Sequence, residues 1–141
     1  MPDKDYSGTP LWKKLGLREG SRVLLVDPPA GFAQRLVPLQ AGVMLLKRPS
    51  NPLDVVVLFV TRRAELERRF PPLARAIAPG GRLWVAWPKK SADLPTDIAF
   101  ADAQGIGLDA GLVDNKSASV TETFQGLQFV YRSKDRPAPV P

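Results

Sequence analysis

The feature that most constrains the fold is a pair of apolar segments, residues 55–60 and 83–87, that flank one amphipathic stretch. Neither segment contains a charged side chain. A strand with one wet face alternates polar and apolar residues, so these segments predict strands that are covered on both faces. The stretch between them, over 61–78, carries one helical stripe of apolar residues, namely Leu66, Phe70, Leu73 and Ile77. This strand–helix–strand unit predicts an α/β domain with an open, mostly parallel sheet and helices on both faces.

Two further strands are expected before this unit. Residues 22–27 predict another central strand, and Val43–Leu46 predict a short strand after a helix over 32–37. The direction of the short strand stays open. The link over residues 47–53 reaches roughly 23–25 Å when extended, and a parallel return crossing needs about 20 Å, so a link without a helix is feasible. The alternative is an antiparallel strand at the sheet edge.

Both ends of the folded part carry their own signals. Thr9 is expected to cap a short helix over 11–15, with Pro10 at its first position and Gly16 at its end. Near the C-terminus, two β-rich runs separated by a Gly-containing turn, at 113–122 and 127–132, predict an antiparallel hairpin.

Prolines and glycines divide the middle of the chain. Pro71-Pro72 is expected to kink or split the central helix, because proline lacks an N–H donor. Pro79-Gly80-Gly81 is expected to end that helix and turn into the next strand. Thr96 or Asp97 then predicts the cap of a helix that runs to about Gln104, with its end weakened by two glycines.

The composition limits the chemistry. The chain has 141 residues with no cysteine and no histidine. Thiolate nucleophiles, His general bases and zinc sites with Cys or His ligands are thereby excluded, and we predict no metal site. Carboxylate or Lys chemistry remains, or no chemistry at all. The net charge of +6 favours anionic partners, although the basic residues are spread in pairs rather than gathered in one run.

We expect one domain over residues 1–132, with mobile residues 1–8 and a disordered, Pro-rich tail over 133–141. The longest apolar runs are too short to span a bilayer, and the N-terminus lacks the pattern of a secretory signal. A cytoplasmic protein that does not enter a membrane is the expectation.

The apolar strand at 54–60, followed by the segment LARAIAPGGRLWV at 73–85, resembles class I S-adenosylmethionine-dependent methyltransferases in a shortened form. Ala110-Gly111-Leu112 before the hairpin fits the same pattern. The resemblance covers about residues 20–132 and implies a Rossmann-like (methyltransferase-like) sheet with a C-terminal antiparallel hairpin. It also implies that S-adenosylmethionine would be held after the first strand, at Asp27 and Gly31.

The chain departs from that pattern at the cofactor position. The turn after the first strand is Asp27-Pro28-Pro29-Ala30-Gly31, with two prolines where these enzymes need glycines for close approach of the backbone. The second strand ends in Leu46-Lys47-Arg48, which reverses the charge of the carboxylate that holds the ribose in such enzymes. Their third strand is missing. We therefore predict no cofactor, with S-adenosylmethionine as the alternative.

A second resemblance rests on three segments: Tyr6-Ser7-Gly8-Thr9-Pro10-Leu11, Lys13-Lys14-Leu15-Gly16 and Trp87-Pro88-Lys89-Lys90-Ser91. Together they are similar to an uncharacterised bacterial domain-of-unknown-function family, number three thousand and fifty-two. This resemblance spans most of the chain and implies no activity.

Ligands of open α/β sheets bind outside the carboxyl ends of the strands, at the point where the strand order reverses. In this chain the predicted rim is basic, and a helix N-terminus there offers free N–H groups to an anion. The candidate anion-binding residues are Thr61, Arg62, Trp87, Lys89, Lys90, Ser91 and Thr96. The alternative is purely structural: Thr61 caps a helix, the cations are solvated, and Trp87 belongs to the core.

Three functions compete. The first is a non-catalytic binding or regulatory protein on a degraded methyltransferase-like fold, which recognises an anionic small molecule or an acidic protein surface at the basic rim. The second is a small methyltransferase with an altered cofactor site. The third is a nucleic-acid-binding protein. The oligomeric state stays open, although the edge of the terminal hairpin offers a route to a homodimer.

Overall fold

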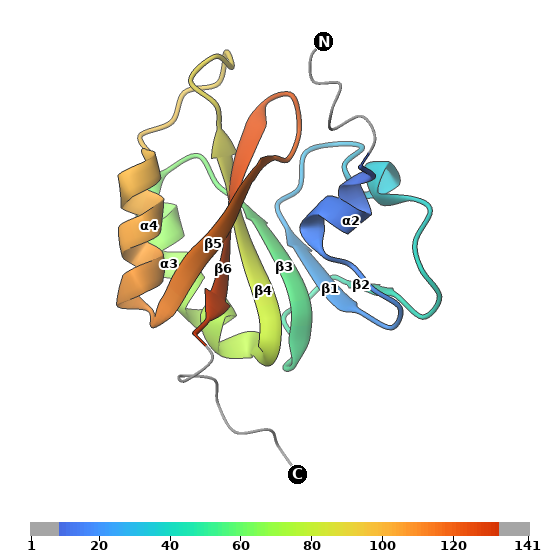
Figure 1. The fold of residues 1–141 in the computed structure, drawn as a ribbon. Helices are drawn as coiled ribbons and strands as arrows, with labels where there is room; N and C mark the ends of the chain where they lie inside the picture. Colours follow the sequence, from blue (N-terminus) through green and yellow to red (C-terminus); the bar gives the residue numbers. More distant parts are fainter. Residues whose placement is uncertain (1–8, 133–141) are drawn as a thin grey trace.

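The computed structural model describes residues 9–132, and it contains one mixed sheet in the strand order β2-β1-β3-β4-β6-β5 (Figure 1). The strands are β1 (Arg22–Val26), β2 (Met44–Leu46), β3 (Leu53–Phe59), β4 (Ile77–Pro88), β5 (Leu112–Ser119) and β6 (Phe124–Tyr131). The helices are α2 (Leu11–Leu15), the short 3-10 helix η1 (Ala33–Leu36), α3 (Arg63–Ala76) and α4 (Phe100–Asp109). The predictions for residues 1–8 and 133–141 fall outside the described part.

Strands β1 to β4 run parallel, whereas β6 pairs antiparallel with β4 and β5 pairs antiparallel with β6. The predicted α/β architecture with a C-terminal hairpin is confirmed. The direction of β2 is settled as well. It lies at the sheet edge but runs parallel to β1, so the antiparallel alternative is wrong.

The core lies on both faces of the central β3–β4 pair. Trp84 and Trp87 are three residues apart on β4 and therefore point to opposite faces. Trp84 packs in one apolar cluster with Leu15 of α2, to whose carbonyl oxygen its Nε1–H donates a hydrogen bond of 3.0 Å. Trp87 packs in the other cluster with Phe70 of α3. The strands therefore lack alternating polar and apolar residues because both faces of the sheet are buried.

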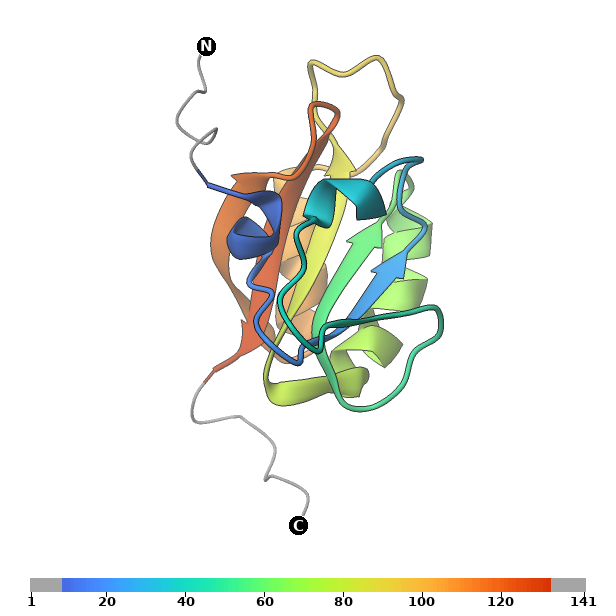
Figure 2. The same ribbon diagram turned by 90° about the vertical axis from the view of Figure 1, so that its right-hand side faces the viewer.

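Helices cover the two faces unequally. Figures 1 and 2 show α3 and α4 against one face, while α2 and η1 lie on the other. Leu66 and Phe70 of α3 and Ala103 of α4 belong to the cluster that contains Trp87, whereas Phe32 and Leu36 around η1 belong to the cluster of Trp84. No helix in residues 9–132 is long and apolar enough to cross a membrane.

Several helix boundaries differ from the prediction. Helix α2 spans the predicted residues and ends at Gly16 in the left-handed conformation, but its N-cap is Pro10 rather than Thr9. Helix α3 runs unbroken through Pro71 and Pro72, so the predicted split is wrong. Its apolar stripe stays packed on the sheet through both prolines, and this packing offsets the two lost N–H donors.

The segment Pro79-Gly80-Gly81 does not form the predicted turn before β4. It lies inside β4 as a bulge, because Ile77 pairs with Leu53 and the next pair joins Arg82 to Val55. A Cβ atom on Gly81 would lie only 2.8 Å from the carbonyl oxygen of Leu53. Glycine is required here by the close approach of a neighbouring strand.

Helix α4 begins later than predicted and continues through its two glycines. Its N-cap is Ala99, whose backbone N–H donates to Asp102 Oδ2 at 2.8 Å, and it ends at Asp109 rather than near Gln104. Gly107 packs directly on the buried ring of Phe129. A glycine that looks like a helix breaker in the sequence is therefore the position at which α4 approaches β6.

The two glycines of α4 give a matched test of this packing. A Cβ atom at Gly107 would overlap the ring of Phe129, whereas a Cβ atom at Gly105 would have no neighbour within 4 Å. We expect Gly107→Ala to lower the free energy of unfolding by about 1–3 kcal/mol through overpacking. Gly105→Ala should raise it by about 0.5–1 kcal/mol, because alanine is the better helix former. Urea unfolding followed by tryptophan fluorescence measures both, and equal effects of the two changes would contradict the close packing.

Candidate functional site

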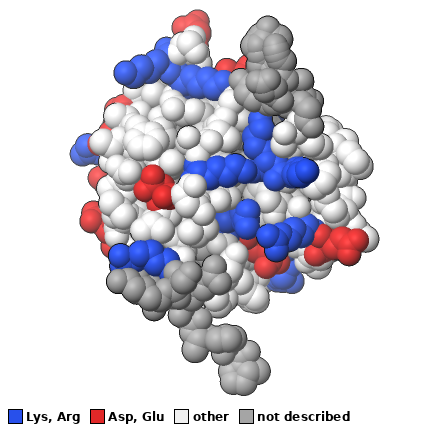
Figure 3. All heavy atoms as spheres, viewed as in Figure 1, with Lys and Arg blue, Asp and Glu red and all other residues white. Residues whose placement is uncertain are grey.

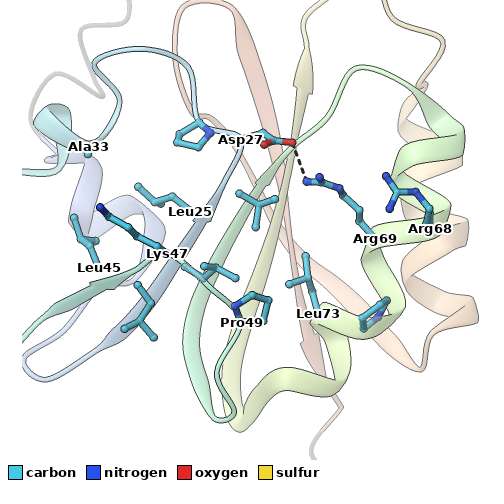
Figure 4. Close-up of a pocket in the computed structure, with 14 residues that line it drawn as sticks. Leu25, Asp27, Ala33, Leu45, Lys47, Pro49, Arg68, Arg69 and Leu73 are labelled. Carbon is cyan, nitrogen blue, oxygen red and sulfur yellow. Dashed lines mark hydrogen bonds and ion pairs between the residues drawn. The ribbon is translucent and has the colours of Figure 1, made fainter.

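A cavity of about 740 Å³ extends across the carboxyl ends of β1 and β2 (Figure 4). We call it the strand-end groove. Helix α3 borders one side and η1 reaches the other. Its walls are mainly apolar and include Leu25, Val26, Leu45, Leu46, Pro72 and Leu73. Its size and its apolar lining are typical of a site for a small organic ligand.

The groove exists because no helix connects β2 to β3. The chain returns from Leu46 to Leu53 through a short link, and Pro49 of that link lines the groove together with Pro72 and Leu73 of α3. A helix in this connection would cover the ends of β1 and β2. Without one, Leu45 keeps 38% of its surface exposed. The sequence predicts that a link without a helix is feasible, but it does not predict the cavity that this link leaves.

The charged groups of the groove are arranged unequally. Asp27 at the end of β1 accepts a hydrogen bond of 2.8 Å from Arg69 Nη1, and Arg69 also lies 3.2 Å from Glu65. Arg68 pairs with the same Glu65 at 2.8 Å. Lys47 lies on the β2 side of the groove, and no ion pair or hydrogen bond joins its amine to any residue of 9–132. Two of the three cations that line the groove are therefore neutralised, and Lys47 is not.

A smaller cavity of about 220 Å³ lies between the ends of β1 and β3, where the strand order reverses. Its lining includes the carboxylates of Asp27 and Glu65, together with Thr61 and the ring of Phe124, and contains no cation. Both carboxylates at this point of the sheet, where the sequence predicts an anion, are paired with arginines of α3, and no unpaired cation among the described residues lines the cavity. An anion is better placed at the β2 end of the rim.

The structure brings some of the predicted rim residues together and separates others. The hydroxyl of Thr96 donates a hydrogen bond of 2.7 Å to the carbonyl oxygen of Thr61. The backbone N–H of Arg63, at the start of α3, donates to Asp97 Oδ1 at 2.7 Å. The prediction of an open helix N-terminus beside Thr61 and Arg62 is wrong at this donor, since a carboxylate of the chain already occupies it.

The loop after β4 turns toward the terminal hairpin. Lys89 Nζ donates to Ser119 Oγ at 2.7 Å, and Lys90 and Ser91 are exposed. Trp87 is only 2% exposed and its ring packs edge-on near that of Phe100, with 6.4 Å between centroids. Of the two roles left open for Trp87, the structure supports the core and not a stacking surface.

Of the two positions expected for a cofactor, Asp27 lines the groove, whereas Gly31 follows it in the turn after β1 and does not. Asp27 has a positive φ of 54° and Gly31 a φ of 82°, so the turn after β1 bends sharply even though it contains two prolines. The carboxylate of Asp27 is engaged by Arg69. Within residues 9–132 there is also no group of three or more acidic side chains that could hold a metal ion.

One basic patch is not evident from the sequence. Lys and Arg side chains gather in the middle of the face that Figure 3 shows. Lys116 of β5 donates a hydrogen bond of 2.9 Å to the carbonyl oxygen of Lys14 and lies 5.9 Å from the ring centre of Trp84. Burial lowers the pKa of Arg82, and the like charge of Arg18 lowers it further. Lys14 and Arg18 are far in the sequence from Arg82 and from Lys116, so only the sheet topology reveals the patch.

Comparison with known proteins identifies the fold but no relative in sequence. No family model matches the chain, and no curated protein matches it. Membership of the domain-of-unknown-function family therefore stays a prediction. Solved structures do match. The mitomycin 7-O-methyltransferase MmcR has a TM-score of 0.63 at 11% identity, over 88% of this chain and 53% of that one. This chain thus spans about half of the length of that enzyme.

Two shorter methyltransferases match over more of their own length. A SAM-dependent methyltransferase from Aquifex aeolicus has a TM-score of 0.60 at 18% identity, over 83% of this chain and 85% of that one. Magnesium protoporphyrin IX methyltransferase (ChlM) from Synechocystis PCC 6803, with bound SAH, has a TM-score of 0.57 at 11% identity, over 86% and 78%. The fold is methyltransferase-like. At these identities the likeness shows the fold alone.

The contact between Asp97 and α3 can be tested by truncation. We expect Asp97→Ala to lower the free energy of unfolding by about 1 kcal/mol, because it leaves the first N–H of α3 without its acceptor. Asp93→Ala is the matched control. Asp93 is an exposed carboxylate in the same loop, and no hydrogen bond or ion pair joins it to a described residue. Its removal should stay within about 0.5 kcal/mol, and equal effects in chemical denaturation would show that Asp97 does not cap α3.

Proposed function

We propose that this protein is a non-catalytic binding or regulatory protein, which uses a methyltransferase-like fold as a scaffold and recognises an anionic ligand or partner at the carboxyl end of its parallel strands. Membership of the domain-of-unknown-function family would fit this proposal, since that family implies no activity. The ligand is an anionic small molecule or an acidic protein surface.

One observation carries the proposal. At the ends of β1 and β2, where a nucleoside cofactor would be bound, the described part of the chain offers no unpaired carboxylate to hold it. The carboxylate of Asp27 is held by Arg69 at 2.8 Å. At the end of β2, where the resemblance calls for a carboxylate, the chain places Lys47, whose amine has no partner in residues 9–132. An unpaired cation at the end of β2 repels a cation and attracts an anion.

A small methyltransferase with an altered cofactor site is the second candidate, and the fold supports it. The strand-end groove is large enough for a cofactor-sized molecule, and it lies where open α/β sheets bind ligands. A nucleic-acid-binding protein is the third candidate. The basic patch formed by Lys14, Arg18, Arg82 and Lys116 supports it, and it requires an affinity that falls steeply with salt.

Calorimetric titration of the purified protein separates these candidates. We expect no heat of binding from S-adenosylmethionine or its demethylated product at millimolar concentration. Pyrophosphate, a compact polyanion, serves as the probe for the basic rim. Its affinity should fall about tenfold in the double variant Lys89→Ala with Lys90→Ala, because the half-buried Lys89 and the exposed Lys90 together contribute roughly 1 kcal/mol or somewhat more near an anion.

A charge-matched control shows whether position or net charge is responsible. The double variant Lys13→Ala with Arg75→Ala also removes two positive charges, but from exposed positions on α2 and α3. It should bind pyrophosphate like the unaltered protein. Micromolar binding of S-adenosylmethionine that is lost on Asp27→Ala would favour the enzyme instead. Equal losses in both double variants would refute a rim-specific site.

A further inference from the structure

The apolar lining of the strand-end groove restricts what an anionic ligand can look like. Side chains of β1, β2 and α3 form most of its surface, among them Leu25, Leu45, Leu46 and Leu73. A compact, fully hydrated anion gains nothing from such walls and would lose water contacts against them. A ligand that fills the groove must carry an apolar body, which gains free energy as it leaves water.

The charges of the groove restrict the polar part of the ligand. Arg69 bridges Asp27 and Glu65, and Arg68 also pairs with Glu65, so the α3 side is close to neutral. Lys47 alone offers an uncompensated positive charge among the described lining residues. Figure 4 shows it beside Leu45 and on the opposite side of the groove from Arg68 and Arg69. One negative charge at one end of the ligand satisfies this arrangement.

We infer that the strand-end groove binds a free, monomeric alkyl carboxylate, with its carboxylate on Lys47 and its chain along the apolar walls toward Leu73. This inference rests on the proposed function and names the ligand class for it. The cavity of about 740 Å³ has room for a chain of many carbons. Such a ligand needs none of the glycine-rich backbone that a nucleotide requires, which agrees with the two prolines after β1.

The test titrates hexanoate, octanoate and decanoate, all below their micelle concentrations, into the full chain. Each methylene group that leaves water contributes about fourfold in affinity when it is fully buried, so every two methylene groups should tighten binding by about fifteenfold. Lys47→Gln should weaken decanoate about tenfold, since it removes a charge-assisted hydrogen bond. Arg48 is a neighbouring exposed cation that does not line the groove, so Arg48→Gln should leave the affinity unchanged.

A matched pair of substitutions on β2 tests the apolar wall of the groove. Leu45→Gln places an amide on the groove wall, whereas Met44→Gln changes the neighbouring residue, which is 49% exposed and does not line the groove. We expect Leu45→Gln to flatten the dependence on chain length and Met44→Gln to preserve it. The neutral amide decanamide should bind about tenfold more weakly than decanoate, and Lys47→Gln should not weaken it further.

The outcomes separate this inference from the proposed function. Pyrophosphate binding that depends on Lys89 and Lys90, without any binding of alkanoates, would leave the function standing and refute the groove ligand. Alkanoate affinity that does not depend on chain length or on Lys47 would also overturn it. Binding only to vesicles that contain decanoate would identify a membrane surface instead. A dimer that Leu45→Gln dissociates would identify a second copy as the occupant.

Discussion

The burial of both faces of the β3–β4 pair is the constraint on which the rest of the structure depends. Because neither strand offers a wet face, the chain must supply cover on both sides of the sheet. Trp84 and Trp87 mark the two sides: one ring packs with α2, and the other packs under α3 and α4. The hairpin of β5 and β6 then closes the far edge of β4 through six paired residues. The positions of the other helices and strands follow from the need to bury these two faces.

Fewer helices cover the opposite edge of the sheet, which is formed by β1 and β2. The connection between β1 and β2 contains only a four-residue 3-10 helix, and the connection between β2 and β3 contains no helix at all. Apolar side chains that would lie under a helix in a longer chain, such as Leu45, therefore face a groove. The groove and the hydrophobic core thus have the same origin. A sheet whose sequence is apolar on both faces leaves a hydrophobic surface wherever the helices are missing.

The sequence predicts the strands well because their signal is local. Unbroken apolar runs and a stripe along α3 locate β1, β3 and α3 within about two residues and also locate the C-terminal part of β4, although β4 begins at Ile77, before the predicted turn. It predicts boundaries poorly where tertiary contacts override local preference. Gly107 looks like a helix end but is the contact between α4 and Phe129, and Asp97 looks like the cap of its own helix but caps α3. The rim lysines are found from the sequence, whereas the state of each one, paired or unpaired, depends on partners that are many residues away.

The electrostatics of the strand ends extend this argument from fold to ligand. An anion is drawn to unpaired positive charge, and contacts within the chain engage several of the cations and one helix N-terminus near the strand ends. Asp27 and Glu65 pair with Arg68 and Arg69 of α3, Asp97 accepts a hydrogen bond from the first N–H of that helix, and Ser119 accepts one from the amine of Lys89. The amine of Lys47, at the end of β2, has no such partner among residues 9–132 and lies beside the apolar lining of the groove. A positive charge and an apolar surface are adjacent at this place. A ligand with a negative charge at one end and an apolar chain at the other therefore fits it better than a purely ionic ligand.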